Sequence, residues 1–217
     1  WAQAVREPHP GVFALRVLRK EACARLLLQI EGARERELER GGRPTAPNSM
    51  HRHGVLLGVL GFDALLADLM TRWVRPMAAL LLPQFNGATL NAYHGYLVEY
   101  ARDRDERLAF HVDDSDVTFN LCLSGTCEGA ELTMLGLRCD RHRDTELLPG
   151  ERYEHRHEPG VAVLHAGRHR HRVEGLRSGV RRNLILWCRD AAPSDVSTKA
   201  PACQPWCAWG SRTATSV

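Results

Sequence analysis

The sequence lacks a hydrophobic run long enough to cross a membrane. Its longest apolar run, residues 77–82, is far shorter than the roughly 18–20 residues that a membrane helix needs. It also lacks a basic segment followed by an apolar one at its start, as a secretion signal would require, and it does not begin with methionine. We therefore expect no membrane span in this chain, and we interpret the chain as a fragment whose targeting signals are unknown.

The sequence has little excess of charge of either sign. Its 29 basic and 26 acidic residues are interspersed and give a formal net charge of +3. Domains that bind nucleic acid usually carry a concentrated basic patch, so no nucleic-acid partner is expected. At 217 residues, with 44% hydrophobic residues, the chain is long enough for one domain with a proper hydrophobic core.

A disulfide framework is also lacking. The chain has an odd number of scattered cysteines, Cys23, Cys122, Cys127, Cys139, Cys188, Cys203 and Cys207. This pattern favours a reducing, cytoplasmic compartment, although the localisation stays unknown. Cys203 and Cys207 have a spacing found in metal sites, but no second pair accompanies them. The sequence therefore leaves open either a small zinc site or two thiols in a loose tail.

The N-terminal part of the chain is predicted to be helical. Apolar residues recur at steps of three and four over residues 13–38, after a turn at residues 8–11, and this spacing is typical of an amphipathic helix. A second helix is expected to start at Asp63 as its N-cap and to be interrupted at Pro76. We assign residues 1–88 to an N-terminal helical region that supports the core.

From Thr89 onward the hydrophobic period changes to two, which predicts strands. Several short strands separated by turns, following helices, indicate an α+β fold with a sandwich-like barrel. We place this catalytic-type domain at residues 89–190 and a non-periodic tail at 191–217. Trp206 and Trp209 are unusual for a loose tail and could dock on the domain.

One short motif carries the chemistry of the chain. On an extended segment, His111 and Asp113 point to the same side, because side chains alternate along a strand. A later histidine, of which His171 is our choice, would complete a set of two histidines and one carboxylate. Such a set binds ferrous iron on one face and leaves the opposite positions open. Arg181 offers a guanidinium suited to one carboxylate of a dicarboxylic acid.

The ordered set His111-x-Asp113, His171 and Arg181 resembles the 2-oxoglutarate- and Fe(II)-dependent dioxygenases, in particular the prolyl-4-hydroxylase-like branch. Two further stretches are similar to the 2-oxoglutarate and iron-dependent oxygenase domain-containing protein 2 group. These are Pro47-Asn48-Ser49-Met50 followed by Gly54-Val55-Leu56-Leu57, and Arg181-x-Asn183-Leu184-x-x-Trp187.

The resemblance implies a double-stranded β-helix, or jelly roll, with N-terminal supporting helices. It implies that His111, Asp113 and His171 are the catalytic residues and ligands of Fe(2+), and that Arg181 and Tyr100 bind 2-oxoglutarate. The implied reaction uses O2, converts 2-oxoglutarate to succinate and CO2, and hydroxylates a protein or peptide substrate, prolyl-like in kind. L-ascorbate is implied as an auxiliary reductant.

The residues themselves leave alternatives at the site. His165 and His169 lie in the same region as His171, and we assign His165 to a supporting position and His169 to a turn. Asp114 and Asp116 could compete with Asp113. The remaining open choices are Arg182 in place of Arg181, Tyr100 as a packed core aromatic, Thr118 and Asn120 as co-substrate contacts, and His51 with His53 as metal ligands.

Two other functions remain open at this stage. One is a non-catalytic double-stranded β-helix that serves as a binding or scaffold module. The other is a zinc hydrolase that uses the same three ligands. A hydrolase would not need Arg181, so this residue distinguishes it from the oxygenase.

Overall fold

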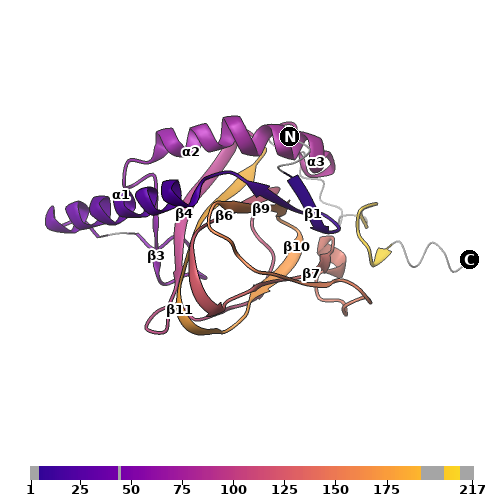
Figure 1. The fold of residues 1–217 in the computed structure, drawn as a ribbon. Helices are drawn as coiled ribbons and strands as arrows, with labels where there is room; N and C mark the ends of the chain where they lie inside the picture. The colour runs from indigo at the N-terminus through magenta and orange to yellow at the C-terminus, as the bar shows by residue number, and fades with distance from the viewer. Residues whose placement is uncertain (1–4, 44, 192–202, 211–217) are drawn as a thin grey trace, which may run out of the picture.

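The computed structural model describes residues 5–43, 45–191 and 203–210, and its strands form two antiparallel sheets that face each other (Figure 1). The larger sheet has the strand order β1-β2-β9-β6-β11-β4-β3, and the smaller has β5-β10-β7-β8. The larger sheet consists of β1 (Val5–His9), β2 (Val12–Arg16), β9 (Val161–Ala166), β6 (Val117–Gly129), β11 (Leu176–Arg189), β4 (Ala92–Tyr100) and β3 (Gly54–Leu56). The smaller sheet consists of β5 (Leu108–His111), β10 (His169–Val173), β7 (Leu132–Leu137) and β8 (Arg152–His155).

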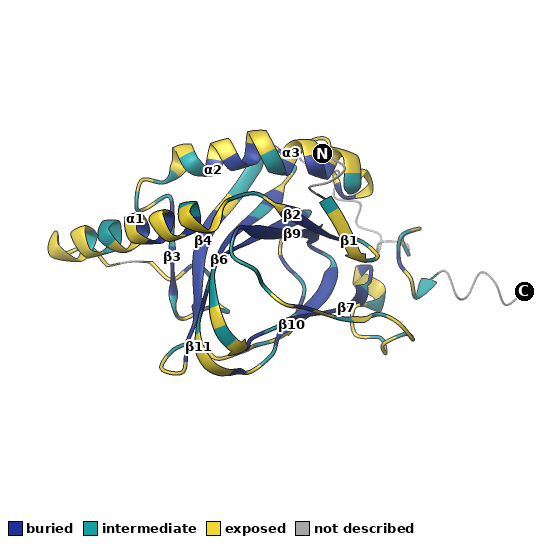
Figure 2. Cartoon of the chain, viewed as in Figure 1, coloured by how far each residue is buried: buried dark blue, intermediate teal, exposed yellow. Residues whose placement is uncertain are grey.

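Helices cover the outer face of the larger sheet (Figure 1). They are α1 (Lys20–Glu39), α2 (Asp63–Leu69), a π-helical turn (Met70–Val74) and α3 (Arg75–Leu81), with short 3-10 turns at Pro83–Phe85 and Asp140–His142. Figure 2 shows that α1 turns its buried side to the sheet and its exposed side to solvent. Among the described residues, no helix is both long enough and apolar enough to span a membrane.

Two hydrophobic clusters lie on opposite faces of the larger sheet. Ile30 of α1 and Leu66 of α2 pack with Phe119 on the helix side. Val163 and Ile185 pack between the sheets, together with Tyr96, Val98, Met134 and Val173. The inner cluster reaches only part of the space between the sheets, and polar side chains occupy the rest. This architecture confirms the predicted double-stranded β-helix with supporting helices.

Strand β11 shows how alternation separates these two environments. Leu184 and Leu186 belong to the helix-side cluster, whereas Ile185 belongs to the cluster between the sheets. Arg181 and Asn183 share the parity of Ile185 and are almost completely buried. Because β11 pairs with β4 without a break in register over residues 181–189, the inward face of β11 is fixed from Arg181 onward.

The predicted helix over residues 13–38 is wrong at its N-terminal end. Val12–Arg16 form strand β2, and the helix begins only at Lys20. β2 pairs with β9, with Phe13 opposite Leu164 and Leu15 opposite Ala162. Residues 12–15 are all buried. The helical spacing of apolar residues runs from this segment into α1 without a break, but pairing with β9 makes the segment a strand.

The second predicted helix is found, with small differences at its start and middle. Asp63 is the first helical residue, and Phe62 occupies the N-cap without a side-chain hydrogen bond. The interruption near Pro76 is a π-helical turn that ends at Val74, and Pro76 is the second residue of α3, which continues the same helix.

Two further differences concern the smaller sheet and the tail. His169 is the buried first residue of β10 and not a turn residue. The tail predicted from residue 191 lies mostly outside the described residues, but its described part docks on the domain. The Trp206 ring lies 4.9 Å from that of Phe85, and the Arg138 guanidinium lies 5.6 Å from the Trp209 ring. The boundaries at residues 88 and 190 stay predictions.

Candidate functional site

His111 and His171 meet inside the barrel because they are direct partners across the β5–β10 strand pair. Their ring centroids are 4.1 Å apart. The Nδ1 atom of His111 lies 2.8 Å from the carbonyl of Ala109, and that of His171 lies 2.8 Å from the carbonyl of His169. A carbonyl requires a donor, so Nδ1 carries the proton in both rings. The Nε2 atoms are then left with free lone pairs, as metal ligation requires.

Asp113 completes a group of three potential metal ligands with these histidines. Its Oδ1 lies 3.5 Å from Nε2 of His111 and 3.6 Å from Nε2 of His171. Its Oδ2 accepts a hydrogen bond of 2.6 Å from the hydroxyl of Thr118, which is itself 2.9 Å from the Ser115 hydroxyl. One carboxylate oxygen is therefore held by the protein, and the other faces the two imidazoles.

The surroundings keep these ligands in the protonation states that a metal needs. Burial acts to raise the pKa of Asp113, but its electrostatic interactions with the neighbouring histidines, His171 foremost, hold it well below its usual range. Burial lowers the pKa of His171 to about 3, and His111 adds to this effect. At neutral pH the site thus has an ionised carboxylate and a neutral His171, without a proton to displace there. Two imidazoles with free Nε2 lone pairs and one carboxylate on one face fit a ferrous ion.

The competing residues lie elsewhere. The ring of His165 is 5.1 Å from that of His171, and its Nδ1 lies 2.9 Å from the Ala166 carbonyl. This is the supporting position predicted for it. Asp114 pairs with Arg189 at the surface, and Asp116 accepts a hydrogen bond from the backbone of Asp190. Neither joins the group of three.

The unusually basic stretch around His171 sends its cations away from this group. Arg170 and Arg172 alternate with His171 on β10, so they point to the opposite face. The Arg170 guanidinium donates to the carbonyl of Leu135 at 2.7 and 3.0 Å. Arg172 donates to Glu174 at 2.9 Å. The positive charge therefore does not oppose a cation at the site.

Arg181 is a buried cation on the opposite sheet. It is 2% exposed, and its guanidinium lies 4.3 Å from the centre of the Tyr100 ring, its register partner on β4. One amino group donates to the Ala130 carbonyl at 2.7 Å, but the buried Nε has no partner. Among the described residues, no carboxylate forms an ion pair with Arg181. A buried guanidinium with an unused donor fits an acidic group supplied by a ligand. Arg182, by contrast, points outward and pairs with Glu99.

Tyr100 has a partner that the sequence analysis did not assign. Its hydroxyl lies 2.9 Å from Nε2 of His51, whose Nδ1 lies 3.1 Å from Asn48 Oδ1. Burial lowers the pKa of His51 to about 4, and the charges of both Asp113 and Arg181 act on it. His51 thus lies within electrostatic reach of both ends of the site and is not a metal ligand. The Pro47-Asn48-Ser49 motif was the available signal, because it fixes the loop that carries His51.

The interior between these groups contains further buried polar atoms without partners. Asn183 donates to Asn120 Oδ1 at 2.6 Å, yet its own Oδ1 has no partner, and neither does Nε2 of His157. Buried polar atoms are usually satisfied, so several unpaired ones in one interior indicate a space that a polar ligand fills. The hydroxyl of Thr118, which the sequence left open as a co-substrate contact, donates to Asp113.

Two cavities approach the site from different sides. A cavity of about 530 Å³ is lined by Arg181 and His157, together with residues of the β6–β7 turn. A second cavity, of about 630 Å³, opens beside Asp113. Its wall includes Arg168, Arg189 and, from the C-terminal segment, Trp206. The first cavity gives access to the buried cation, and the second gives access to the metal ligands.

Comparison with known proteins agrees with this geometry. Residues 1–87 match the model of a family described as the OGFOD2-like domain. Over 201 residues the chain is 39% identical to 2-oxoglutarate and iron-dependent oxygenase domain-containing protein ICU11 of Arabidopsis thaliana, covering 93% of this chain and 51% of that protein. Over 197 residues it is 34% identical to 2-oxoglutarate and iron-dependent oxygenase domain-containing protein 2 of Xenopus tropicalis, covering 90% of this chain and 52% of that protein.

The chain thus spans about half the length of these curated relatives. Among solved structures it is similar to the non-heme alpha ketoglutarate dependent carbocyclase SnoK. The TM-score is 0.62 at 18% identity, over 85% of this chain and 82% of that one. At this identity the likeness concerns the fold alone. The family resemblance drawn from the sequence motifs is confirmed by these comparisons.

Proposed function

We propose that this chain is the catalytic domain of an Fe(II)- and 2-oxoglutarate-dependent dioxygenase. The observation that carries the proposal is the combination of two features. A ligand group is buried on one sheet, and on the other lies a buried cation that has no carboxylate partner among the described residues. His111, Asp113 and His171 fit a ferrous ion, and Arg181 fits the distal carboxylate of the co-substrate. A zinc hydrolase would have no use for the buried cation, and a scaffold would have no reason to keep either.

Each residue would have a distinct task. His111, Asp113 and His171 would hold the iron, with Thr118 fixing the orientation of the carboxylate. Arg181 would bind one end of 2-oxoglutarate, while Tyr100 packs on the guanidinium and presents its hydroxyl beside it. Iron bound with 2-oxoglutarate and O2 would supply the oxidation of the 2-oxo acid to succinate and CO2, coupled to hydroxylation of a C–H bond.

We further propose a peptidyl, prolyl-like substrate that enters through the cavity beside Asp113. Asp114 and Arg189, which line this cavity, have side chains 84% and 47% exposed, so the opening faces solvent. An open, polar entrance accepts one residue of a long chain while the rest stays outside. A small-molecule substrate is the competing outcome. L-ascorbate would act only as an auxiliary reductant.

Succinate formation tests the activity. Purified protein with Fe(II), 2-oxoglutarate and ascorbate under air, with and without a peptide pool, should form succinate, and His171→Ala should abolish it. His169→Ala is a matched control, because His169 is equally buried on the same strand face but is not in the ligand group. Binding of 2-oxoglutarate without turnover under all conditions would favour a binding module, and no binding at all would refute the proposal.

A further inference from the structure

A second group of metal-ligating side chains lies away from the iron site. Cys139, His142, Cys203 and Cys207 each offer one atom, and these atoms all lie within 4.8 Å of one another. Cys139 and His142 border the 3-10 turn after β7, whereas the other two come from the C-terminal segment. Two sulfurs of the segment 203–210 therefore lie beside one sulfur and one imidazole of the domain.

The distances within the group are those of a tetrahedral zinc site. His142 Nδ1 lies 3.4 Å from Sγ of Cys139, 3.4 Å from that of Cys207 and 3.6 Å from that of Cys203. The sulfurs of Cys139 and Cys203 are 4.0 Å apart. With Zn–S of about 2.3 Å and Zn–N of about 2.0 Å, tetrahedral geometry places sulfur and nitrogen about 3.5 Å apart and two sulfurs about 3.8 Å apart.

The backbone around the ligands is adapted to this arrangement. A Cβ added at Gly210 would lie 2.1 Å from Sγ of Cys203, so only glycine allows the segment to close over the sulfur. The turn is held by hydrogen bonds from the Cys207 amide to the Gln204 carbonyl at 2.9 Å and from the Gly210 amide to the Cys207 carbonyl at 3.0 Å. Short turns of this kind bring paired ligands of structural zinc sites together.

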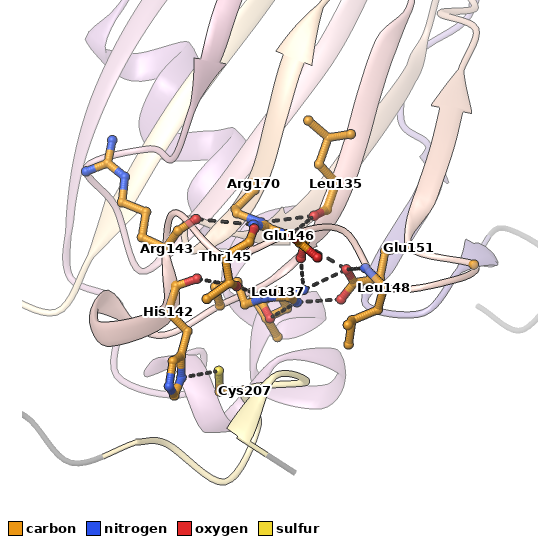
Figure 3. A network of polar contacts seen from close by, with 12 residues as sticks. Leu135, Leu137, His142, Arg143, Thr145, Glu146, Leu148, Glu151, Arg170 and Cys207 are labelled. Atoms are coloured by element: carbon orange, nitrogen blue, oxygen red, sulfur yellow. Dashed lines mark hydrogen bonds and ion pairs between the residues drawn. The ribbon is translucent and has the colours of Figure 1, made fainter. Parts of the chain in front are cut away.

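Two buried arginines hold the other pair of ligands in place (Figure 3). Arg138 forms an ion pair with Glu151 and donates to Thr145, whose hydroxyl donates to the His142 carbonyl at 2.7 Å. Arg170 donates to the Thr145 carbonyl at 2.6 Å. Figure 3 shows this network lying directly beside the contact between His142 and Cys207. The loop that carries His142 is thus fixed independently of the C-terminal segment.

We infer that Cys139, His142, Cys203 and Cys207 form a structural Zn²⁺ site that clips the C-terminal segment to the domain. The clip positions Gln204 and Trp206, which line the cavity beside Asp113. The zinc site therefore builds one wall of the entrance to the iron site. Three thiolates and one imidazole are a common structural zinc set, and they leave no open position for catalysis. The inference does not depend on the proposed oxygenase activity.

Replacement of zinc by cobalt tests the site directly. In the full chain with Asp113→Ala, which disables the iron site, Co²⁺ should give the intense visible bands of a tetrahedral ion and thiolate-to-cobalt charge transfer. Cys207→Ser should weaken the charge transfer, because it removes one of three thiolates, and Cys127→Ser, at a cysteine outside the group, should retain it in full. His142→Cys should keep one bound metal with a shifted spectrum, even if Cys207→Ser proves too unstable to study.

Zinc content and exchange complete the test. Wild-type protein should retain one Zn²⁺ per chain after mild chelation, and removal of that zinc should make amide hydrogen exchange in residues 203–210 at least tenfold faster. A Cys139–Cys203 disulfide in the protein as isolated would overturn the inference. So would metal binding without any thiolate signature, or equal zinc retention by the Cys207→Ser and Cys127→Ser variants.

Discussion

His111 and His171, sixty positions apart in the chain, are direct partners across an antiparallel strand pair. Directly opposite residues in such a pair point to the same face of the sheet and lie close together. The metal site is therefore specified by strand register, since a slip of one residue would move His171 to the other face. Asp113 lies two residues beyond the end of β5, and its backbone amide donates to the Gly167 carbonyl at 2.9 Å. This bond ties the ligand loop to the β9–β10 turn.

Thr118→Val should weaken iron binding by about 10- to 100-fold, because Asp113 loses the hydroxyl that orients its carboxylate. Titration of the protein with Fe(II) under anaerobic conditions measures this change. Thr133→Val is the matched control, since Thr133 is also buried in a strand but donates to Glu174 away from the site. An iron affinity within twofold of wild type for Thr118→Val would contradict the assigned role.

Arg181→Gln should raise the KM for 2-oxoglutarate by at least about 100-fold, because a charge-assisted bond to a buried carboxylate contributes about 1.5–3 kcal/mol and the remaining desolvated carboxylate adds to the loss. Steady-state succinate formation at varied 2-oxoglutarate measures this. Arg182→Gln, one position along the same strand on the outward face, should leave the KM unchanged. Equal effects of the two substitutions would show that Arg181 does not bind the co-substrate.

Tyr100→Phe should raise the KM for 2-oxoglutarate several-fold and change kcat little. The ring contact with Arg181 is kept, but His51 loses its hydroxyl partner, and one hydrogen bond is worth about 1 kcal/mol. Tyr96→Phe, four positions away on the same strand face and equally buried, serves as the control. A normal KM for Tyr100→Phe would leave this tyrosine with a packing role only.

Stability should fall as the pH is lowered from about 6.5 to 4. Burial lowers the pKa of His155 to about 4, whereas an unfolded histidine titrates near 6.5. Between these values the unfolded chain binds more protons than the folded one, so protonation favours unfolding. The shift corresponds to at most about 3 kcal/mol for His155. His155→Gln should therefore flatten the pH dependence of Tm in this window; an unchanged slope would refute the assignment.

Sequence periodicity showed which residues of the central strands share a face, but it did not show which face points inward. The choice of Arg181 over Arg182 came from the family resemblance and the spacing to Trp187, whereas the His-x-Asp spacing placed its own two side chains together. These shared faces depend on local geometry. They remain valid wherever a strand forms, because the alternation of side chains does not depend on which strand lies beside it.

Contacts between residues that are distant in the sequence could not be predicted from periodicity. Helical periodicity in residues 13–16 gave no sign that β9 offers an edge on which β2 can pair. His51 could not be connected to Tyr100, since the loop that carries His51 has no periodic pattern. Cys139 and His142 were passed over because the second half of their group lies about sixty residues further along the chain. In each case the structure depends on tertiary contacts, which the local sequence pattern does not predict.

The division of the proposed site between the two sheets has a thermodynamic consequence. Both histidine ligands lie on the smaller sheet, whereas Arg181 and Tyr100 lie on the larger one. A co-substrate that chelates the iron and also pairs with Arg181 would link the two sheets. Iron and co-substrate should then strengthen each other's binding by the same factor, as linkage requires. Their joint stabilisation of the fold should exceed the sum of their separate effects.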